Sequence, residues 1–413
     1  MALFGLARSR VPAASRCLTR GVHDYVRGVA DHIPYKVHLK SPKVVGVVTS
    51  RGNREYMEDA TSVCALEIDA GELERSLPLS AADWAPENAG DHELARQVEY
   101  FGIFDGHGGK AVSGFLQANL ARIIETVKPE DIQPTIESTV EIGGYFKRWR
   151  GGALKRWTDW SHDKAEIGKD NLTVDERLTL AFLKAVLLDP KQRQEATPTE
   201  TTLTPGGPGG QDDGRQGEPP HWVAERVWLT VAHTGDTRVL LCNSVNGEVT
   251  ALTDRHHAES RTEAARLRRL GTADGAGMIT DSFGESRWMG AVENTRGFGD
   301  FEWKPMGVTA EPEITHKLIE GRDNAYLVLV TDGLTNMLSD QEIVDLARQA
   351  SDPTRAAKNI VHFGEDLGAQ DNCTCIVVPL AGWGHVGGED TTEPRREYRR
   401  RQARMYNGRM QRQ

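Results

Sequence analysis

The sequence predicts an α+β domain built from layers of sheet and helix. Strands precede helices in both halves of the chain, and many of the apolar runs of strand length stand in hairpin-like pairs. The strict strand–helix–strand alternation of a parallel sheet is absent. We therefore expect paired strands that are covered by helices.

Each strand is predicted from a short run of apolar, often β-branched residues. The expected strands cover 44–50, 61–68, 100–104, 227–233, 239–242, 325–330 and 373–379. The fourth and fifth of these bracket the turn HTGDTR. Residues 70–97 read as an irregular, acidic surface insertion.

Helices are predicted where apolar residues recur every three or four positions. The expected helices cover 112–127, 174–188, 259–270, 340–350 and 352–367. Ser339 and Glu342 have the spacing of a capping box, which would begin the helix over 340–350.

Three further segments have unusual composition. Residues 191–220 are rich in Pro, Gly and Thr and are expected to be disordered, as is the arginine-rich tail that ends the chain. Residues 128–170 contain Trp149, Trp157 and Trp160 among basic residues. They could form a lid or a docking surface, but we favour packing of the indoles on the body.

The N-terminal segment has the composition of a mitochondrial transit peptide. It contains Arg8, Arg10, Arg16 and Arg20 among small and hydroxylated residues, with no acidic residue before Asp24. The alternative is a disordered basic tail. We expect a transit peptide within 1–35, one large domain over 36–385 and a basic tail over 386–413, and hence a protein of the mitochondrial matrix or intermembrane space.

The net charge of −10 is unevenly distributed, because both ends of the chain are basic and the body is strongly acidic. An acidic body argues against nucleic acid as the main partner and suits the binding of cations. No apolar stretch approaches the ~20 residues that a membrane helix needs. We expect a monomer without a membrane span, whose basic tail could dock on acidic partners.

Five cysteines without regular spacing do not indicate a disulfide framework. Cys373 and Cys375 lie on one face of an expected strand. A pair of ligands for a soft metal is conceivable there, but small buried core residues are the favoured interpretation.

Aspartates stand at the ends of several expected core strands. They are Asp59, Asp105, Asp236, Asp332 and Asp371. One such aspartate is usually a turn or cap residue, but five at the rims of core strands would repel one another unless cations neutralise them. Oxygen ligands with few histidines or cysteines indicate Mg²⁺ or Mn²⁺.

The stretch FGIFDGHGG, residues 101–109, adds two groups to this set. Gly106 lets the backbone turn tightly and expose its carbonyl beside Asp105. His107, two residues from an expected metal ligand on a glycine-rich turn, is a candidate general acid.

These motifs together resemble the metal-dependent protein serine/threonine phosphatases of type 2C, including mitochondrial fungal members. The fragments MEDA, FGIFDGHGG, HTGDTRVLL, NTRGFGDFEWK, LVTDGL and QDNCTCIVV occur in the family's order across about residues 44–380. The resemblance implies a four-layer α-β-β-α sandwich, with two central, mostly antiparallel sheets flanked by helices. It also implies a dinuclear metal centre at one end of the sandwich.

The resemblance assigns roles by motif position. The implied metal ligands are Glu58, Asp59, Asp105, the Gly106 carbonyl, Asp332 and Asp371, with Asp236 as ligand of a weaker third metal. Arg54 would bind the substrate phosphate, with Arg51 as a nearby competitor. His107 would protonate the leaving oxygen.

Two segments depart from the family's pattern. DGLTN has Thr335 and Asn336 where the family has tryptophan and a second aspartate, so affinity for the third metal is in doubt. The segment before NTRGFGD differs from the flap of typical members, and its Arg287 and Trp288 could contact substrate or simply pack.

The implied activity is hydrolysis of phosphoserine and phosphothreonine monoesters by a metal-bridging hydroxide, on mitochondrial phosphoproteins. The alternative is a catalytically inactive relative that serves as a binding or regulatory module. A metal-dependent nuclease is disfavoured by the acidic body.

Overall fold

A computed structural model gives the fold of residues 22–30, 33–77, 96–142, 172–187, 224, 226–268, 277–280 and 286–410. The tryptophan-containing segment 143–171, the loop 191–220 and most of the expected transit peptide lie outside these described residues. Within them, no helix is long and apolar enough to cross a membrane.

The first central layer is a five-stranded sheet in which every neighbouring pair is antiparallel. Its strands, in spatial order, are β3 (Gly46–Ser50), β13 (Cys373–Pro379), β12 (Asn324–Val330), β7 (Arg238–Asn243) and β8 (Val249–Ala251). Strand β12 lies at the centre, where Val328 pairs with Val377 on one side and with Leu240 on the other.

The second layer consists of two antiparallel pairs. Strand β4 (Ala60–Glu67) pairs with β5 (Gln97–Phe104), and β6 (Arg226–His233) pairs with β11 (Glu313–Glu320). The turn between β6 and β7 therefore leads from the second layer into the first.

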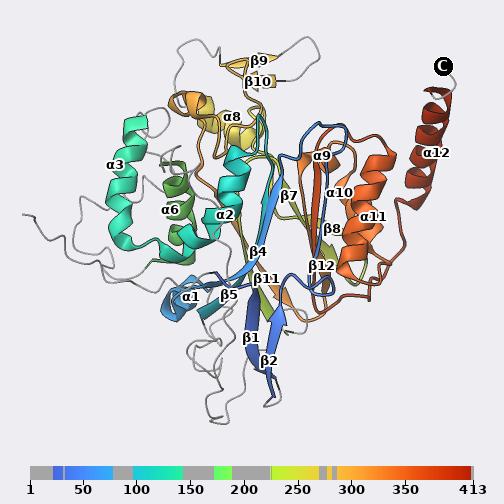
Figure 1. Cartoon of the computed structure of the whole chain (residues 1–413), viewed down its shortest axis with the longest axis horizontal. Helices are drawn as coiled ribbons and strands as arrows, with labels where there is room; N and C mark the ends of the chain where they lie inside the picture. The colour runs from blue at the N-terminus through green and yellow to red at the C-terminus, as the bar shows by residue number, and fades with distance from the viewer. Residues whose placement is uncertain are drawn as a thin grey trace, which may run out of the picture.

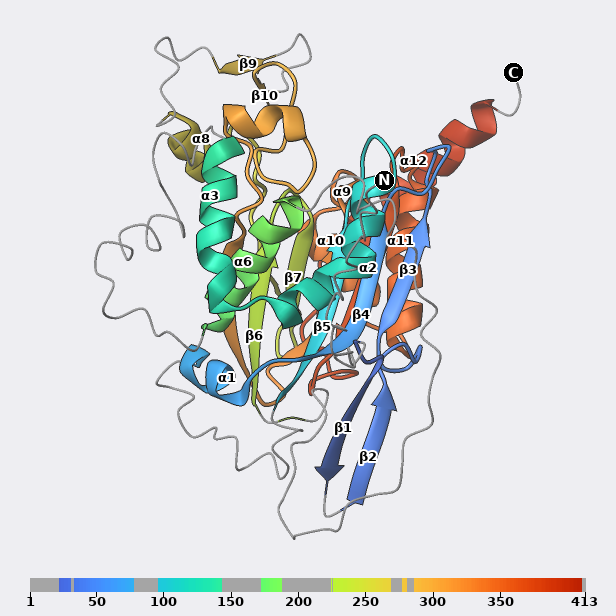
Figure 2. The ribbon, with the colours of Figure 1, turned by 60° about the vertical axis from the view of Figure 1, so that its left-hand side comes forward.

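Helices cover both outer faces (Figures 1 and 2). The five-stranded sheet is covered by α9 (Asp332–Thr335), α10 (Asp340–Ala347) and α11 (Pro353–Asp366), and the other layer by α2 (Ala111–Thr126), α3 (Ile132–Ile142) and α6 (Val174–Leu187). Further elements are α1 (Ala70–Ser76), α8 (Arg261–Arg268), β9 (Met278–Thr280), β10 (Ser286–Trp288) and the 3₁₀ helices η4 (Pro129–Asp131) and η5 (Phe301–Met306).

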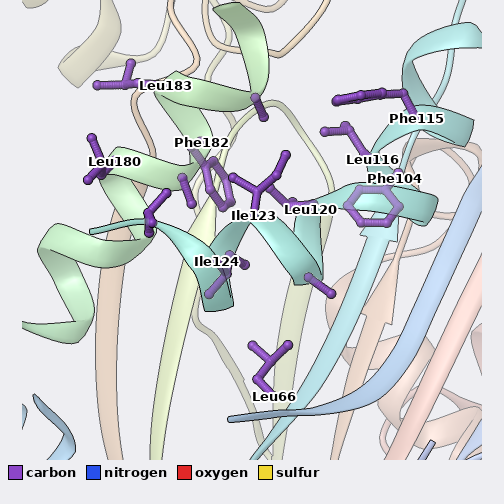
Figure 3. Packing of buried hydrophobic residues seen from close by; sticks show 14 of the residues in the cluster. Leu66, Phe104, Phe115, Leu116, Leu120, Ile123, Ile124, Leu180, Phe182 and Leu183 are labelled. Carbon is purple, nitrogen blue, oxygen red and sulfur yellow. The ribbon is translucent and has the colours of Figure 1, made fainter. Parts of the chain in front are cut away.

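Alternation of side chains along β12 shows how the layers are held together. Leu327 and Leu329 are buried between the two sheet layers, whereas Val328 and Val330 pack against the helices. A third cluster lies under α2 and α6, where Leu120 and Phe182 are buried (Figure 3). Burial of this apolar surface is the main stabilising term. The expected four-layer α-β-β-α arrangement is confirmed.

The structure tests the predictions for the two cysteines of β13 and for the start of α10. Cys373 and Cys375 are fully buried in the cluster under α10 and α11, which agrees with the packing interpretation.

Glu342 donates its backbone N–H to Ser339 Oγ at 3.3 Å and accepts from the Ser339 backbone N–H at 2.9 Å. The capping box at the start of α10 is thus confirmed.

The prediction of an irregular segment from residue 70 was wrong at its start. Residues 70–76 form α1, because the Asp69 carboxylate caps it by accepting from the backbone of Gly71 at 3.0 Å and of Glu72 at 3.3 Å. Residues 78–95 lie outside the described part of the chain.

The prediction of a disordered C-terminal tail was also wrong. Residues 393–410 form helix α12 (Glu393–Met410), which lies beside α11 (Figure 1). Arg399 donates to both carboxylate oxygens of Glu342 at 3.0 and 3.1 Å, and Arg400 lies 3.5 Å from Asp366. The acidic partners of these arginines are distant in sequence, which is why composition alone indicated disorder.

Several elements were missed, among them α3, β8, β11 and a hairpin near the N-terminus. Strands β1 (Tyr25–Ala30) and β2 (Ile33–His38) form an antiparallel hairpin that extends away from the layers (Figure 2). Val26 is buried, and His23 pairs with Ala65 of β4. The hairpin overlaps the end of the expected transit segment.

Candidate metal centre and active site

The strand register brings the predicted aspartates to one edge of the two sheet layers. Ala60 pairs with Phe104 in the antiparallel β4–β5 pair. Asp59, just before β4, and Asp105, just after β5, therefore lie opposite each other at one end of this pair. Arg238 pairs with Val330, so Asp236 and Asp332 lie beyond the same ends of β7 and β12. Asp371 lies two residues before β13.

Hydrogen bonds tie the two layers together at this edge. Asp59 is buried, and its Oδ2 accepts from the hydroxyls of Thr331 at 3.0 Å and Thr374 at 2.7 Å, both from the other sheet. The backbone N–H of Asp332 donates to Asp105 Oδ2 at 3.2 Å. Because Thr331 and Asp332 are adjacent, these bonds connect Asp59, Asp105, Thr331, Asp332 and Thr374, which lie up to 315 positions apart in sequence.

The carboxylates in this group destabilise one another. Burial, followed by repulsion from Asp332, Asp59 and Asp236, holds the pKa of Asp105 well above its usual range. Burial first, then Asp236 and Asp371, raises the pKa of Asp332 to about 6. A nearby cation would relieve both effects, because it stabilises the charged form of each group.

The loop between β3 and β4 carries Glu58, which is held at both its backbone and its side chain. Its N–H donates to Asn372 Oδ1 at 2.7 Å, and its Oε1 accepts from the Gly109 N–H at 2.6 Å. A side chain at Gly106 would collide with the Glu58 carbonyl oxygen, so only glycine fits there.

Asn372 was not singled out by sequence reasoning. It is buried, and its Nδ2 donates to the carbonyls of Arg51 and Tyr56, each at 3.0 Å. Asn372 therefore fixes the loop that carries Arg54 and Glu58. The only signal in the sequence was its place in the motif QDN.

Arg54 and Arg51 differ in where their guanidinium groups bind. Arg54 Nη2 donates to Asp371 Oδ2 at 2.5 Å, while about half of its side chain stays exposed. This hydrogen bond and the charge of Asp371 raise the pKa of Arg54. Arg51 instead donates to the Glu55 carbonyl of its own loop at 2.8 Å. Arg54 is thus the arginine that reaches the carboxylate group.

His107 lies at the exposed rim of the same group. Three quarters of its side chain is accessible, and its Nε2 lies 3.3 Å from Asp300 Oδ1. The hydrogen bond to Asp300 raises the pKa of His107. Asp300 is a second residue that sequence reasoning did not single out; it is the last residue of the motif NTRGFGD.

Asp236 has a different environment from the other aspartates. Burial alone would raise its pKa, but the neighbouring His257 and Asn294 side chains outweigh burial and lower the pKa. The distance from His257 Nε2 to Asp236 Oδ2 is 3.5 Å.

The residues that depart from the family's pattern are engaged in other contacts. Asn336 Nδ2 donates to Asp332 Oδ2 at 3.2 Å, and Thr335 Oγ1 accepts from Arg255 at 2.9 Å. Trp288 is buried and donates from Nε1 to the Met306 carbonyl at 2.9 Å, so it packs. Arg287 lies 3.9 Å from Glu293.

The donor set fits hard divalent cations. It consists of carboxylate oxygens and a carbonyl, which are the ligands of Mg²⁺ and Mn²⁺ rather than of soft metals. Within the described residues, no group of three or more His, Cys, Asp or Glu side chains lies close enough together to hold a metal ion. Asp59 and Asp371 instead accept hydrogen bonds from threonines and from Arg54, which supply part of the compensation that a cation would give.

A four-layer sandwich with carboxylates, an arginine and a histidine at one edge provides the groups that a metal-dependent phosphoester hydrolase uses. Comparison with known proteins makes this specific. The model of the protein phosphatase 2C family matches residues 221–373. Protein phosphatase 2C homolog 4 of Schizosaccharomyces pombe is 32% identical over 348 residues, which cover 83% of this chain and 82% of that protein. The chain therefore belongs to the protein phosphatase 2C family, whose members generally depend on divalent metal ions.

The chain is also similar to two further proteins. Protein phosphatase 1K, mitochondrial, of Xenopus laevis is 29% identical over 305 residues, covering 72% of this chain and 66% of that protein. A crystal structure of a serine-threonine phosphatase 2C from Toxoplasma gondii aligns with a TM-score of 0.47 at 16% identity, covering 86% of this chain and 98% of the other.

Proposed function

We propose that this protein phosphatase hydrolyses phosphoserine and phosphothreonine monoesters with two Mg²⁺ or Mn²⁺ ions. The proposed ligands are Glu58, Asp59, Asp105, the Gly106 carbonyl, Asp332 and Asp371, and Asp236 would serve a weaker third ion. The observation that carries the proposal is the group of wholly or partly buried, mutually repelling carboxylates at one edge of the sandwich, with Arg54 and His107 at its rim.

The chemistry divides between the ions and the chain. Bound ions would lower the pKa of a water nucleophile and offset charge on the phosphoryl oxygens. Arg54 would bind two phosphate oxygens through its planar guanidinium group. Because its half-exposed side chain contacts Asp371, it would hold the phosphate next to the proposed metal ligands. His107 would give a proton to the leaving serine or threonine oxygen as the P–O bond breaks.

The inactive-module hypothesis is tested by turnover. We expect release of phosphate from p-nitrophenyl phosphate and from a phosphothreonine peptide when Mn²⁺ or Mg²⁺ is added to the full chain, and none after chelation with EDTA. If circular dichroism shows that the protein is folded but neither substrate is turned over with added metal, the inactive module is favoured instead.

We further propose that the substrates are mitochondrial phosphoproteins. The arginine-rich start of the chain supports this, as do the printed names of the Xenopus relative and of a rice relative, probable protein phosphatase 2C member 13, mitochondrial, which is 25% identical over 333 residues. Because Val26 is buried and His23 pairs with Ala65, cleavage is expected before residue 22. N-terminal sequencing of the mature protein from purified mitochondria tests both points.

A further inference from the structure

We propose that Asp300 is the positioning residue of His107: its carboxylate accepts from His107 Nε2 and leaves Nδ1 to face the leaving oxygen. The inference rests on the proposed phosphatase activity and deepens it. The contact joins residues 193 positions apart, with 3.3 Å between Nε2 and Oδ1. His107 itself is three-quarters exposed on a glycine-rich turn, so without such a partner its ring could adopt many orientations.

The backbone at Asp300 is shaped for this contact rather than for helix capping. Asp300 precedes the 3₁₀ helix η5, a position where aspartate usually accepts a hydrogen bond from the first turn. Its φ of 55° and ψ of 46° are left-handed, and its side chain makes no capping hydrogen bond. A left-handed residue other than glycine is an uncommon, slightly strained conformation. Here it directs the carboxylate to His107.

The loop that carries Asp300 is anchored on both sides, so it can hold the carboxylate still. Arg296 donates from Nε and Nη2 to Oε1 of the fully buried Glu263, at 3.0 and 2.9 Å. The ring of Phe298 packs on Phe182 of α6, with 4.9 Å between the ring centroids. Lys304 of η5 donates to the Gly297 carbonyl, which closes the loop from its far end.

This arrangement fixes the direction of the proton transfer. A protonated His107 carries N–H groups on both ring nitrogens. With Nε2–H donated to Asp300, the proton on Nδ1 is the one that passes to the serine or threonine oxygen as that oxygen keeps the electron pair of the broken P–O bond. His107 is left neutral and still bound to Asp300, and solvent returns the proton to Nδ1.

The test compares two substrates that differ in their need for a general acid. An alkyl phosphate such as a phosphoserine peptide has a basic leaving oxygen, whereas p-nitrophenolate leaves without protonation. We expect Asp300→Asn and Asp300→Gly to lower kcat on the peptide about tenfold or more. The upper limit of the loss is the ~10²–10⁴-fold that a general acid contributes, because His107 itself is kept. The loss on p-nitrophenyl phosphate should be at most about threefold, and Asp300→Glu should restore part of the peptide activity.

Several controls separate positioning from general damage. Asparagine and glycine both tolerate the left-handed backbone, so these variants should keep the thermal midpoint and the shift of that midpoint with Mn²⁺. Glu302→Gln removes an exposed acid from the same 3₁₀ helix and should keep both activities. The double variant His107→Ala with Asp300→Asn should be no slower on the peptide than His107→Ala alone.

The outcomes are distinct. Equal losses on the two substrates in Asp300→Asn and Asp300→Gly, or losses that multiply in the double variant, would overturn the positioning role. If the unmodified chain turns over neither substrate, the proposed function itself fails. If it turns over both and the Asp300 variants match it on the peptide, only the role of Asp300 is wrong.

Discussion

The Arg54 guanidinium lies 2.5 Å from the Asp371 carboxylate and so joins the loop after β3 to the loop before β13. Arg54→Lys keeps the charge but loses the planar fork that matches two phosphate oxygens. We expect the KM for a phosphothreonine peptide to rise about tenfold, with a smaller change in kcat. Steady-state kinetics checks this, with Arg51→Lys as the matched control. A larger effect at Arg51 would transfer the phosphate-binding role to that residue.

We expect Asp105 to lower the stability of the metal-free protein and to be required for metal binding and phosphate release. Its carboxylate is partly buried beside Asp332, Asp59 and Asp236, so Asp105→Asn removes repulsion in the metal-free protein. We expect the thermal midpoint of the metal-free variant to equal or exceed that of the unmodified chain. Added Mn²⁺ should no longer raise it, and phosphate release should be lost. A variant that still gains stability with Mn²⁺ would remove Asp105 from the ligand set.

Glu263 should make folding sensitive to acid. Burial alone would raise its pKa, but Arg266 and Arg296 outweigh burial and lower it from 4.5 to about 2. A lowered carboxyl pKa contributes stability that is present above the unfolded pKa and is lost as pH falls from about 4.5 to 2, amounting to about 3 kcal/mol. Urea unfolding at several pH values below 5 should show this decrease.

Glu263→Gln provides the comparison for that decrease. The variant should lack this part of the pH dependence, and it should be less stable at pH 7 because Arg266 and Arg296 lose their buried partner. The exposed Glu302→Gln should keep the slope of the unmodified protein. An unchanged slope in Glu263→Gln would show that other groups cause the acid sensitivity.

Helix α12 should stabilise the domain mainly through Arg399. Its guanidinium binds both oxygens of the buried Glu342 carboxylate and donates to the Met337 carbonyl at 2.5 Å. Arg399→Ala should lower the free energy of unfolding by about 1–3 kcal/mol, because hydrogen bonds to a charged, buried partner are lost. Arg401→Ala removes an arginine that pairs on the surface with Glu397 and should cost less than ~1 kcal/mol. Equal effects in chemical denaturation would contradict the docking role of Arg399.

The sequence by itself determined most of the central strands and the residue types of the site. Apolar periodicity predicted β12, β13 and α2 to within a few residues, because burial of one face imposes that spacing. The aspartates at strand ends, with Gly106 and His107 in one motif, predicted an oxygen-ligand metal centre. These signals are local, so they can be read along the chain.

Only the tertiary structure decided which distant groups meet. The strand register brings Asp59 to Thr331 and Thr374, and the anchored loop before η5 brings Asp300 to His107. The same is true of α12, which looked disordered until Glu342 and Asp366 supplied partners for its arginines. The physical reason is that ion pairs and hydrogen bonds of this kind depend on distances of about 3 Å between side chains, and the order of residues along the chain does not specify such distances.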